Sequence, residues 1–282
     1  MGALREQMER QMVLRRMSVR TRQSYSQAVA ALAKHYRRRP DQLTEREVQD
    51  YLLYLMEERK LAFSSCNVAL HGLRFFYHEI LQHPQMQFAL PKARAPQKLP
   101  EIFSREEIER LFAAACHVKQ RALLMTTYAA GLRVSEVCAL KIADIDSERM
   151  TIRVQQGKGA KDRYTLLSPR LLKELRRYWQ AQRPKSWLFS AARSAERPLN
   201  PHVAQRMFYA ARDKAQITKR CGIHGLRHAF ATHLLEGGTD VHTIQRLMGH
   251  TSIGTTMRYF HLARQKLAGT VSPLEWLSRP QA

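Results

Sequence analysis

Apolar residues recur at helical spacing along the first 90 residues, and polar residues that can cap a helix precede them. Ser18 can cap a first helix, Thr44 and Glu47 form a T-x-x-E capping box, and Ser64 or Ser65 is expected to open a third helix. The three apolar stripes are Tyr25, Val29, Leu32 and Tyr36; Val48, Tyr51, Leu52 and Leu55; and Leu70, Leu73, Phe76, Tyr77 and Ile80. Because these stripes are broad, they predict one small helical bundle.

The second half of the chain repeats the same signals. A second capping box, Ser104 with Glu107, begins a helix, and another helix covers about 119–130 and ends at Gly131. Ser168-Pro169 and Asn200-Pro201 each combine a capping residue with proline at the first helical position. Two further helices are expected at about 224–236 and 240–249, separated by Gly237-Gly238 and with Asp240 as the cap of the second.

One stretch alternates with the period of a strand. Met150–Gln155 and Arg163–Leu167 each alternate apolar and polar positions, with Ile152 and Val154 expected to point inward. A basic, glycine-rich segment, Gly157–Asp162, joins them, which predicts a β-hairpin with a long basic tip. The predicted fold class is therefore mainly α: a helical N-terminal domain followed by an α-rich domain with a small antiparallel β-sheet.

A proline-rich segment separates the two halves. Pro91–Pro100 contains three prolines and three cations, which suit neither a helix nor a strand. We therefore predict a helical domain over residues 1–90, a basic linker over 91–101 and a second domain over 102–282. The basic linker could follow a phosphate backbone or stay solvated, and the sequence does not decide between these.

Charge narrows the class of protein. The 282 residues contain 47 Lys and Arg against 24 Asp and Glu, a net charge of +23, and both halves are basic. Such an excess indicates a polyanionic partner, and nucleic acid is the default. No apolar run is long enough to span a membrane, and the first residues lack a secretory signal. The four cysteines are far apart and form no CxxC pair, so a reducing cytoplasm is expected.

Several residues could carry chemistry. His224 and Arg227, three apart near the start of a helix, would present an imidazole and a guanidinium to an anion. His224 and His228 also have zinc-ligand spacing, but the glutamate of an H-E-x-x-H motif is missing and Arg227 would repel a metal. Further candidates are Arg133 after Gly131, Lys158 in the hairpin tip, His250, and Tyr259. Taken singly, each also fits an ordinary structural role.

Taken in order, R…K…H-x-x-R…H…Y, these six residues resemble the tyrosine recombinase, or phage integrase, family. The resemblance spans about residues 12–272, and all six positions hold the expected residue types: Arg133, Lys158, His224, Arg227, His250 and Tyr259. It implies a helical core-binding N-terminal domain and a catalytic domain with a C-terminal interaction tail. A Xer-like or small mobile-element recombinase without an arm-binding domain is the expected form.

The resemblance implies that Tyr259 attacks a phosphodiester of duplex DNA and forms a 3′-phosphotyrosyl intermediate. Arg133 and Arg227 would brace the non-bridging oxygens, and Lys158 would deliver a proton to the departing 5′-oxygen. His224 would exchange a proton and His250 would donate a hydrogen bond. Since the phosphotyrosyl bond retains the energy of the broken linkage, neither a nucleotide cofactor nor a metal is expected, and no Walker motif is present.

The implied partner is double-stranded DNA with an inverted-repeat core site, bound by a homo-tetramer that forms from monomers, with a possible accessory or partner recombinase. Two other interpretations remain: a DNA-binding or architectural protein that does not cleave, and a type IB topoisomerase-like enzyme with the same chemistry. The target sequence and the direction of the reaction do not follow from the sequence.

Overall fold

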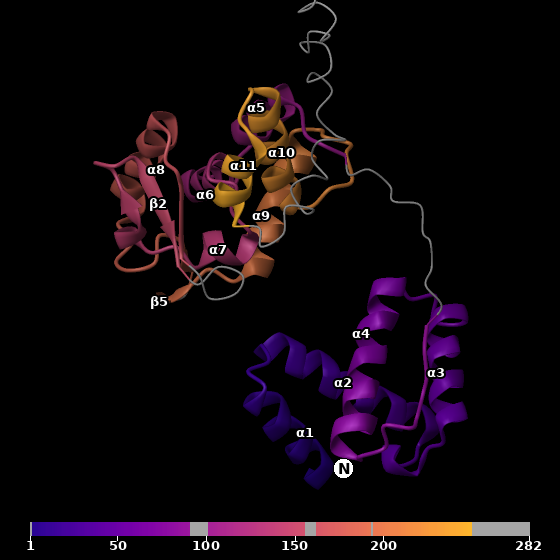
Figure 1. Cartoon of the computed structure of the whole chain (residues 1–282). Helices are drawn as coiled ribbons and strands as arrows, with labels where there is room; N and C mark the ends of the chain where they lie inside the picture. The colour runs from indigo at the N-terminus through magenta and orange to yellow at the C-terminus, as the bar shows by residue number, and fades with distance from the viewer. Residues whose placement is uncertain (1, 91–100, 156–161, 193, 250–282) are drawn as a thin grey trace, which may run out of the picture. The chain divides into compact units, whose positions relative to one another are not determined.

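The computed structural model describes residues 2–90, 101–155, 162–192 and 194–249 (Figure 1). The chain divides into two compact units, Met1–Gln97 and Lys98–Ala282. Of the predicted linker at 91–101, only Glu101 lies within the described residues. None of the described helices is both long enough and apolar enough to cross a membrane.

The N-terminal unit is entirely helical where it is described. Its elements are α1 Gly2–Leu14, α2 Val19–Tyr36, the short 3-10 turn η1 Pro40–Gln42, α3 Glu45–Glu57, α4 Phe63–Arg74 and the π-helical turn η2 Phe75–Ile80. The predicted caps of the first two helices are confirmed: Ser18 accepts a hydrogen bond from the Thr21 N–H, and Thr44 and Glu47 form a reciprocal capping box. All three apolar stripes contact one core.

The predicted start of the third helix is wrong. Helix α4 begins at Phe63, and the capping position is held by Ala62, which offers no side-chain acceptor. The start of α4 therefore carries no capping signal in the sequence. A Cβ at Gly72 would lie 3.0 Å from the Tyr25 Cα, so α4 is pressed directly against α2. Helix α1, which the sequence patterns did not single out, buries Met8 and Met12 in the same core.

The C-terminal unit combines helices with two small sheets. Its elements are α5 Arg105–Ala113, α6 Val118–Ala129, α7 Val134–Cys138, η3 Ile142–Asp144, β1 Ile145–Asp146, β2 Thr151–Val154, β3 Arg163–Leu166, α8 Pro169–Gln182, β4 Ser190–Ala191, β5 Ser194–Pro198, α9 Pro201–Lys214, α10 His224–Glu236 and α11 Val241–Met248. The predicted caps Ser104, Ser168, Asn200 and Asp240 all accept the expected backbone hydrogen bonds. The mainly helical fold class is confirmed.

The predicted hairpin forms two strands, β2 and β3, of a three-stranded antiparallel sheet. The strand order is β1-β2-β3, with Ile152 opposite Thr165 and Val154 opposite Arg163. Ile152 and Val154 are buried, as the alternation predicts. The expectation of one small sheet is wrong, because β4 and β5 pair as a second one. Their residues are mostly exposed, so no alternation of apolar and polar positions marks them.

Candidate active site

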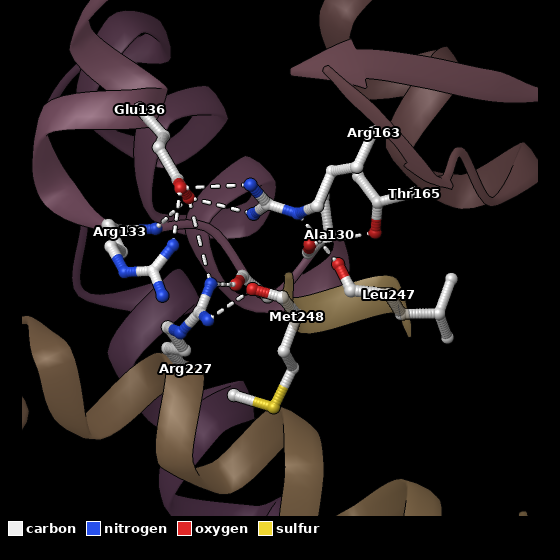
Figure 2. Close-up of polar contacts among 9 residues, drawn as sticks. Ala130, Arg133, Glu136, Arg163, Thr165, Arg227, Leu247 and Met248 are labelled. Carbon is white, nitrogen blue, oxygen red and sulfur yellow. Dashed lines mark hydrogen bonds and ion pairs between the residues drawn. The ribbon is translucent and has the colours of Figure 1, made fainter. Parts of the chain in front are cut away.

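Three of the six predicted site residues lie within the described chain: Arg133, His224 and Arg227. Lys158, His250 and Tyr259 lie outside the described residues. Arg133 holds the capping position of α7, and His224 and Arg227 lie in the first turn of α10. The guanidiniums of Arg133 and Arg227 approach one carboxylate (Figure 2), and both charges act on His224.

Arg133 is placed by the turn that joins α6 to α7. Gly131 has a φ of +60°, a left-handed conformation that favours glycine. A Cβ at this position would lie 2.3 Å from the ring of Phe230 on α10, so the turn also packs too tightly for any side chain. Arg133 then occupies the capping position of α7. Glycine at 131 thus brings the start of α7 against α10.

Arg227 is the largest fully buried side chain of the described chain, with a relative exposure of 1%. One of its Nη atoms donates a hydrogen bond to the Gly131 carbonyl oxygen, and the other donates to the Met248 carbonyl oxygen at the end of α11. The guanidinium therefore joins the turn before α7 to the C-terminal end of α11. A buried cation of this kind needs a counter-charge.

Glu136 supplies that counter-charge, and three arginines surround it (Figure 2). The backbone N–H and Nη1 of Arg133 each lie 2.7 Å from its carboxylate oxygens. Arg163, at the start of β3, donates two parallel hydrogen bonds of 2.9 and 2.8 Å. Arg227 forms an ion pair at 3.6 Å. We call these four residues the Glu136 cluster.

Arg163 also reaches α11. Its Nε donates a hydrogen bond of 2.9 Å to the carbonyl oxygen of Leu247. Gly249, which ends α11 with a φ of +61°, lies so close that a Cβ there would be 2.7 Å from the Arg163 Cδ. Two residues further along β3, the hydroxyl of Thr165 donates to the Ala130 carbonyl oxygen at 2.9 Å. The hairpin, the α6–α7 turn and the end of α11 therefore meet at the Glu136 cluster.

The charges around the site shift its titratable groups. Burial alone raises the pKa of the Glu136 carboxyl, but the hydrogen bonds and charges of Arg163 and Arg133 outweigh it and lower the pKa to about 2. Desolvation lowers the pKa of His224, and the positive charges of Arg227 and Arg133 lower it further, although solvent still reaches one side of this residue. Desolvation also lowers the pKa of His228 to about 4. At neutral pH the carboxylate is therefore ionised and both imidazoles are neutral.

Two neighbouring features, the His224–His228 pair and Tyr164, are placed as follows. The His224 and His228 rings meet edge to face, with centroids 4.7 Å apart, and the described residues contain no group of three potential metal ligands. Tyr164, another tyrosine near the site, is 61% exposed and follows Arg163 on β3. Because successive residues of a strand point to opposite faces, Tyr164 points away from the Glu136 cluster.

Sequence reasoning missed Glu136 and Arg163 as members of the site. Glu136 was visible as the acidic residue three positions after Arg133, the spacing of neighbours on one helix face. Arg163 is the first residue of the strand predicted at Arg163–Leu167, and the sequence distinguishes it only by its place next to the basic tip of the hairpin. Only the fold reveals that its guanidinium turns inward, where its side chain is 10% exposed.

Comparisons with known protein families identify the family of this chain. The family model described as "Phage integrase family" matches residues 101–266, and the model of a phage integrase N-terminal SAM-like domain matches residues 4–87. The chain belongs to the phage integrase family. It is therefore a tyrosine recombinase, as the six ordered residues predicted.

Individual relatives of this integrase-family chain are similar over most of their length. The inferred integrase/recombinase y4qK of Sinorhizobium fredii is 44% identical over 99% of this chain and 91% of its own. The tyrosine recombinase XerA of Pyrococcus horikoshii is 34% identical over 78% of this chain and 77% of its own. A XerA crystal structure aligns with a TM-score of 0.56 at 27% identity, covering 100% of this chain and 99% of its own.

A lambda integrase dimer bound to a core site aligns with this integrase-family chain with a TM-score of 0.73. Its identity is 18%, and the alignment covers 96% of this chain and 99% of that one. A XerH recombinase bound to its palindromic difH substrate aligns with a TM-score of 0.62 at 22% identity. The alignment covers 80% of this chain and 71% of that one. At these identities the two structures establish the shared fold.

Proposed function

We propose that this chain is a site-specific recombinase that cuts and rejoins duplex DNA through a 3′-phosphotyrosyl intermediate on Tyr259. The observation that carries the proposal is the placement of two guanidiniums, Arg133 and Arg227, on one ionised carboxylate (Figure 2), with His224 near enough for both charges to lower its pKa. Two guanidiniums and a neutral imidazole at one point suit a phosphodiester, whose non-bridging oxygens gain charge as it is attacked.

The described residues divide this chemistry between them. Arg133 has a side chain that is 24% exposed, so it can meet a phosphate from solvent, whereas Arg227 is buried and has to be uncovered before it contacts one. His224 is exposed and neutral, so it can accept a proton at neutral pH. Glu136 does not contact the phosphate in this proposal. It keeps the two guanidiniums side by side.

The remaining roles fall on residues outside the described chain. The phenolate oxygen of Tyr259 forms a bond to phosphorus, and the bond from phosphorus to the 5′-oxygen breaks. Lys158 delivers a proton to that oxygen, and attack by a 5′-hydroxyl reverses the step. In the sequence, His250 follows directly on Gly249, the residue that packs on Arg163. This position supports His250 as a hydrogen-bond donor to the phosphate.

The proposed partner is double-stranded DNA with an inverted-repeat core site. The net charge of +23 and the DNA-bound states of the XerH and lambda integrase structures support this partner. A symmetric site places two protomers on one duplex, and strand exchange between two duplexes requires four. We therefore propose monomers that assemble into a tetramer on DNA, with an accessory or partner recombinase where the site is not symmetric. The four free cysteines fit a cytoplasmic site of action.

The proposal is tested by trapping the covalent intermediate. The protein is incubated with duplex DNA covering the regions that flank its gene, and adducts are detected under denaturing conditions and mapped to a junction. Wild type should form an adduct through Tyr259, whereas Tyr259→Phe, which removes only the hydroxyl, should bind DNA within a few-fold of wild type and form none. Binding without an adduct in wild type would instead favour an architectural protein.

Assembly is tested separately with the C-terminal tail. This segment carries Val271, Leu274, Trp276 and Leu277, an apolar load that suits packing on a neighbouring protomer. Deleting residues 270–282 should leave DNA binding in place while light scattering detects no four-subunit complex and strand exchange is lost. Normal tetramers from the truncated chain would refute the role of the tail. Relaxation of supercoiled DNA by a monomer would indicate a topoisomerase-like activity.

A further inference from the structure

We infer that Arg163 is a positioning residue of the recombinase: it holds the Glu136 carboxylate in place, and that carboxylate in turn fixes Arg133 and Arg227. The inference rests on the proposed function, because the reaction that Arg163 supports is cleavage of a phosphodiester. It adds a residue outside the six that carry the chemistry.

The contacts of Arg163 are directed inward. Nη1 and Nη2 donate to the two oxygens of Glu136 at 2.9 and 2.8 Å, and Nε donates to the Leu247 carbonyl oxygen at 2.9 Å (Figure 2). Each of the three guanidinium nitrogens therefore makes a hydrogen bond within the protein. This geometry fits the bidentate recognition of a carboxylate, which fixes orientation as well as distance.

Arg163 limits what Glu136 can take from the other two arginines. A carboxylate has about four acceptor positions, and Arg163 occupies one on each oxygen. Without Arg163, both carboxylate oxygens of Glu136 can accept further hydrogen bonds from Arg133 and Arg227. Those N–H donors are then no longer available to a phosphate. The net charge of the Glu136 cluster also falls from +2 to +1. Both changes weaken stabilisation of the charge that develops on the phosphate.

The packing around Arg163 leaves it little freedom to move. Gly249 lies against its side chain so closely that a Cβ would be 2.7 Å from Cδ, and the positive φ of Gly249 disfavours any other residue. On β3, Arg163 is paired with Val154 of β2, which is buried. The strand β3 and the end of α11 therefore both restrict the Arg163 side chain, so the fold itself fixes the position of its guanidinium.

The chain offers a matched control on the neighbouring strand. Arg153 lies on β2, next to the Val154 that pairs with Arg163, and its Nε contacts the buried Asp144 at 3.2 Å. Its side chain is 41% exposed, and none of its hydrogen bonds or ion pairs reaches the Glu136 cluster. Arg153→Gln removes the same charge from the same hairpin, so it separates a loss of basic charge from a loss of the contact with Glu136.

The test compares cleavage with DNA affinity. On the duplex in which the wild-type adduct is mapped, Arg163→Gln should lower the single-turnover rate of adduct formation by about 10- to 100-fold, the range expected when one member of a coupled buried network is removed. The dissociation constant for DNA should stay within about 3-fold, since Arg163 contacts no phosphate. Arg163→Lys should recover part of the rate, and Arg153→Gln should cleave like wild type.

A double variant then separates positioning from a general structural role. If Arg163 acts through Glu136, adding Arg163→Gln to Glu136→Gln should slow cleavage by less than about 3-fold beyond the Glu136 variant alone. Independent, multiplying losses would overturn the inference, and so would equal cleavage by wild type and Arg163→Gln. Equal losses in Arg163→Gln and Arg153→Gln would also overturn it. A wild-type chain that forms no adduct would overturn the proposed function and this inference with it.

Discussion

Replacing Glu136 with glutamine removes one negative charge and leaves the shape of the side chain almost unchanged. The carboxyl is buried, and its pKa lies at about 2 instead of 4.5 because the arginines around it stabilise the ionised form. That fall corresponds to about 3 kcal/mol of stabilisation at neutral pH. Since glutamine resembles the protonated acid, Glu136→Gln should destabilise the C-terminal unit by about this amount at pH 7.

The pH dependence follows from the direction of the shift. A group with a lowered pKa stabilises the fold above its ordinary value of 4.5, and that contribution is lost as the pH falls toward about 2. The difference in stability between wild type and Glu136→Gln should therefore narrow from about 3 kcal/mol at pH 7 to about 2 kcal/mol at pH 3.5. Other carboxylates titrate in both proteins, so their contributions cancel in the difference.

Urea unfolding followed by tryptophan fluorescence provides the assay. All three tryptophans, Trp179, Trp187 and Trp276, lie in the C-terminal half of the chain, so the signal reports on that unit. Glu148→Gln, at an exposed position of the same unit, is the control and should change stability by less than about 0.5 kcal/mol. Equal stability of wild type and Glu136→Gln at pH 7, or a difference that stays constant down to pH 3.5, would refute the reasoning.

Three further predictions concern packing, catalysis and binding. Gly131→Ala should lower the free energy of unfolding by about 3 kcal/mol or more, because backbone strain adds to an overlap with the Phe230 ring. The control Gly238→Ala, with open space around its Cβ, should lower it by about 1 kcal/mol. Equal losses of stability in urea unfolding would contradict the packing argument. Arg133→Lys should slow adduct formation about 100-fold or more, with a smaller effect on DNA affinity. Filter binding and a cleavage assay measure the two effects. Equal losses of rate and affinity would mark Arg133 as an ordinary contact with the DNA backbone. For the whole chain, the slope of log K against log salt should be steeper than about −4, and a flat dependence would argue against nucleic acid as the partner.

Local signals in the sequence predicted most of the fold. The caps Ser18, Thr44 and Asp240 each bond to backbone a few residues away, so their pattern can be read without knowing the tertiary structure. The same holds for Gly131, whose left-handed conformation ends a helix. The start of α4 escaped this reasoning because its capping position is held by Ala62, whose side chain accepts no hydrogen bond and so leaves no capping signal in the sequence.

The Glu136 cluster shows why the candidate site was only partly predictable. Arg133 and Glu136 are neighbours in sequence, but Arg163 lies 27 residues after Glu136 and 84 residues before Leu247, whose carbonyl it binds. A single sequence gives no signal for contacts of this length. Residue types and their order along the chain were enough to predict candidate site residues. The contacts of Arg163, which depend on packing between segments far apart in the sequence, could not be predicted in this way.

The end of α11 limits the reach of Tyr259, the nucleophile that we propose. Gly249 is anchored beside Arg163, and Tyr259 comes ten residues later. A fully extended chain of ten residues spans about 33–36 Å, so the phenol of Tyr259 works on a tether of at most about that length plus its own side chain. Any phosphodiester that this tyrosine attacks must therefore lie within that distance of Gly249, which packs on Arg163 of the Glu136 cluster. Inserting flexible residues between Gly249 and Tyr259 would enlarge this radius. Each inserted residue would also lower the local concentration of the phenol at the phosphodiester.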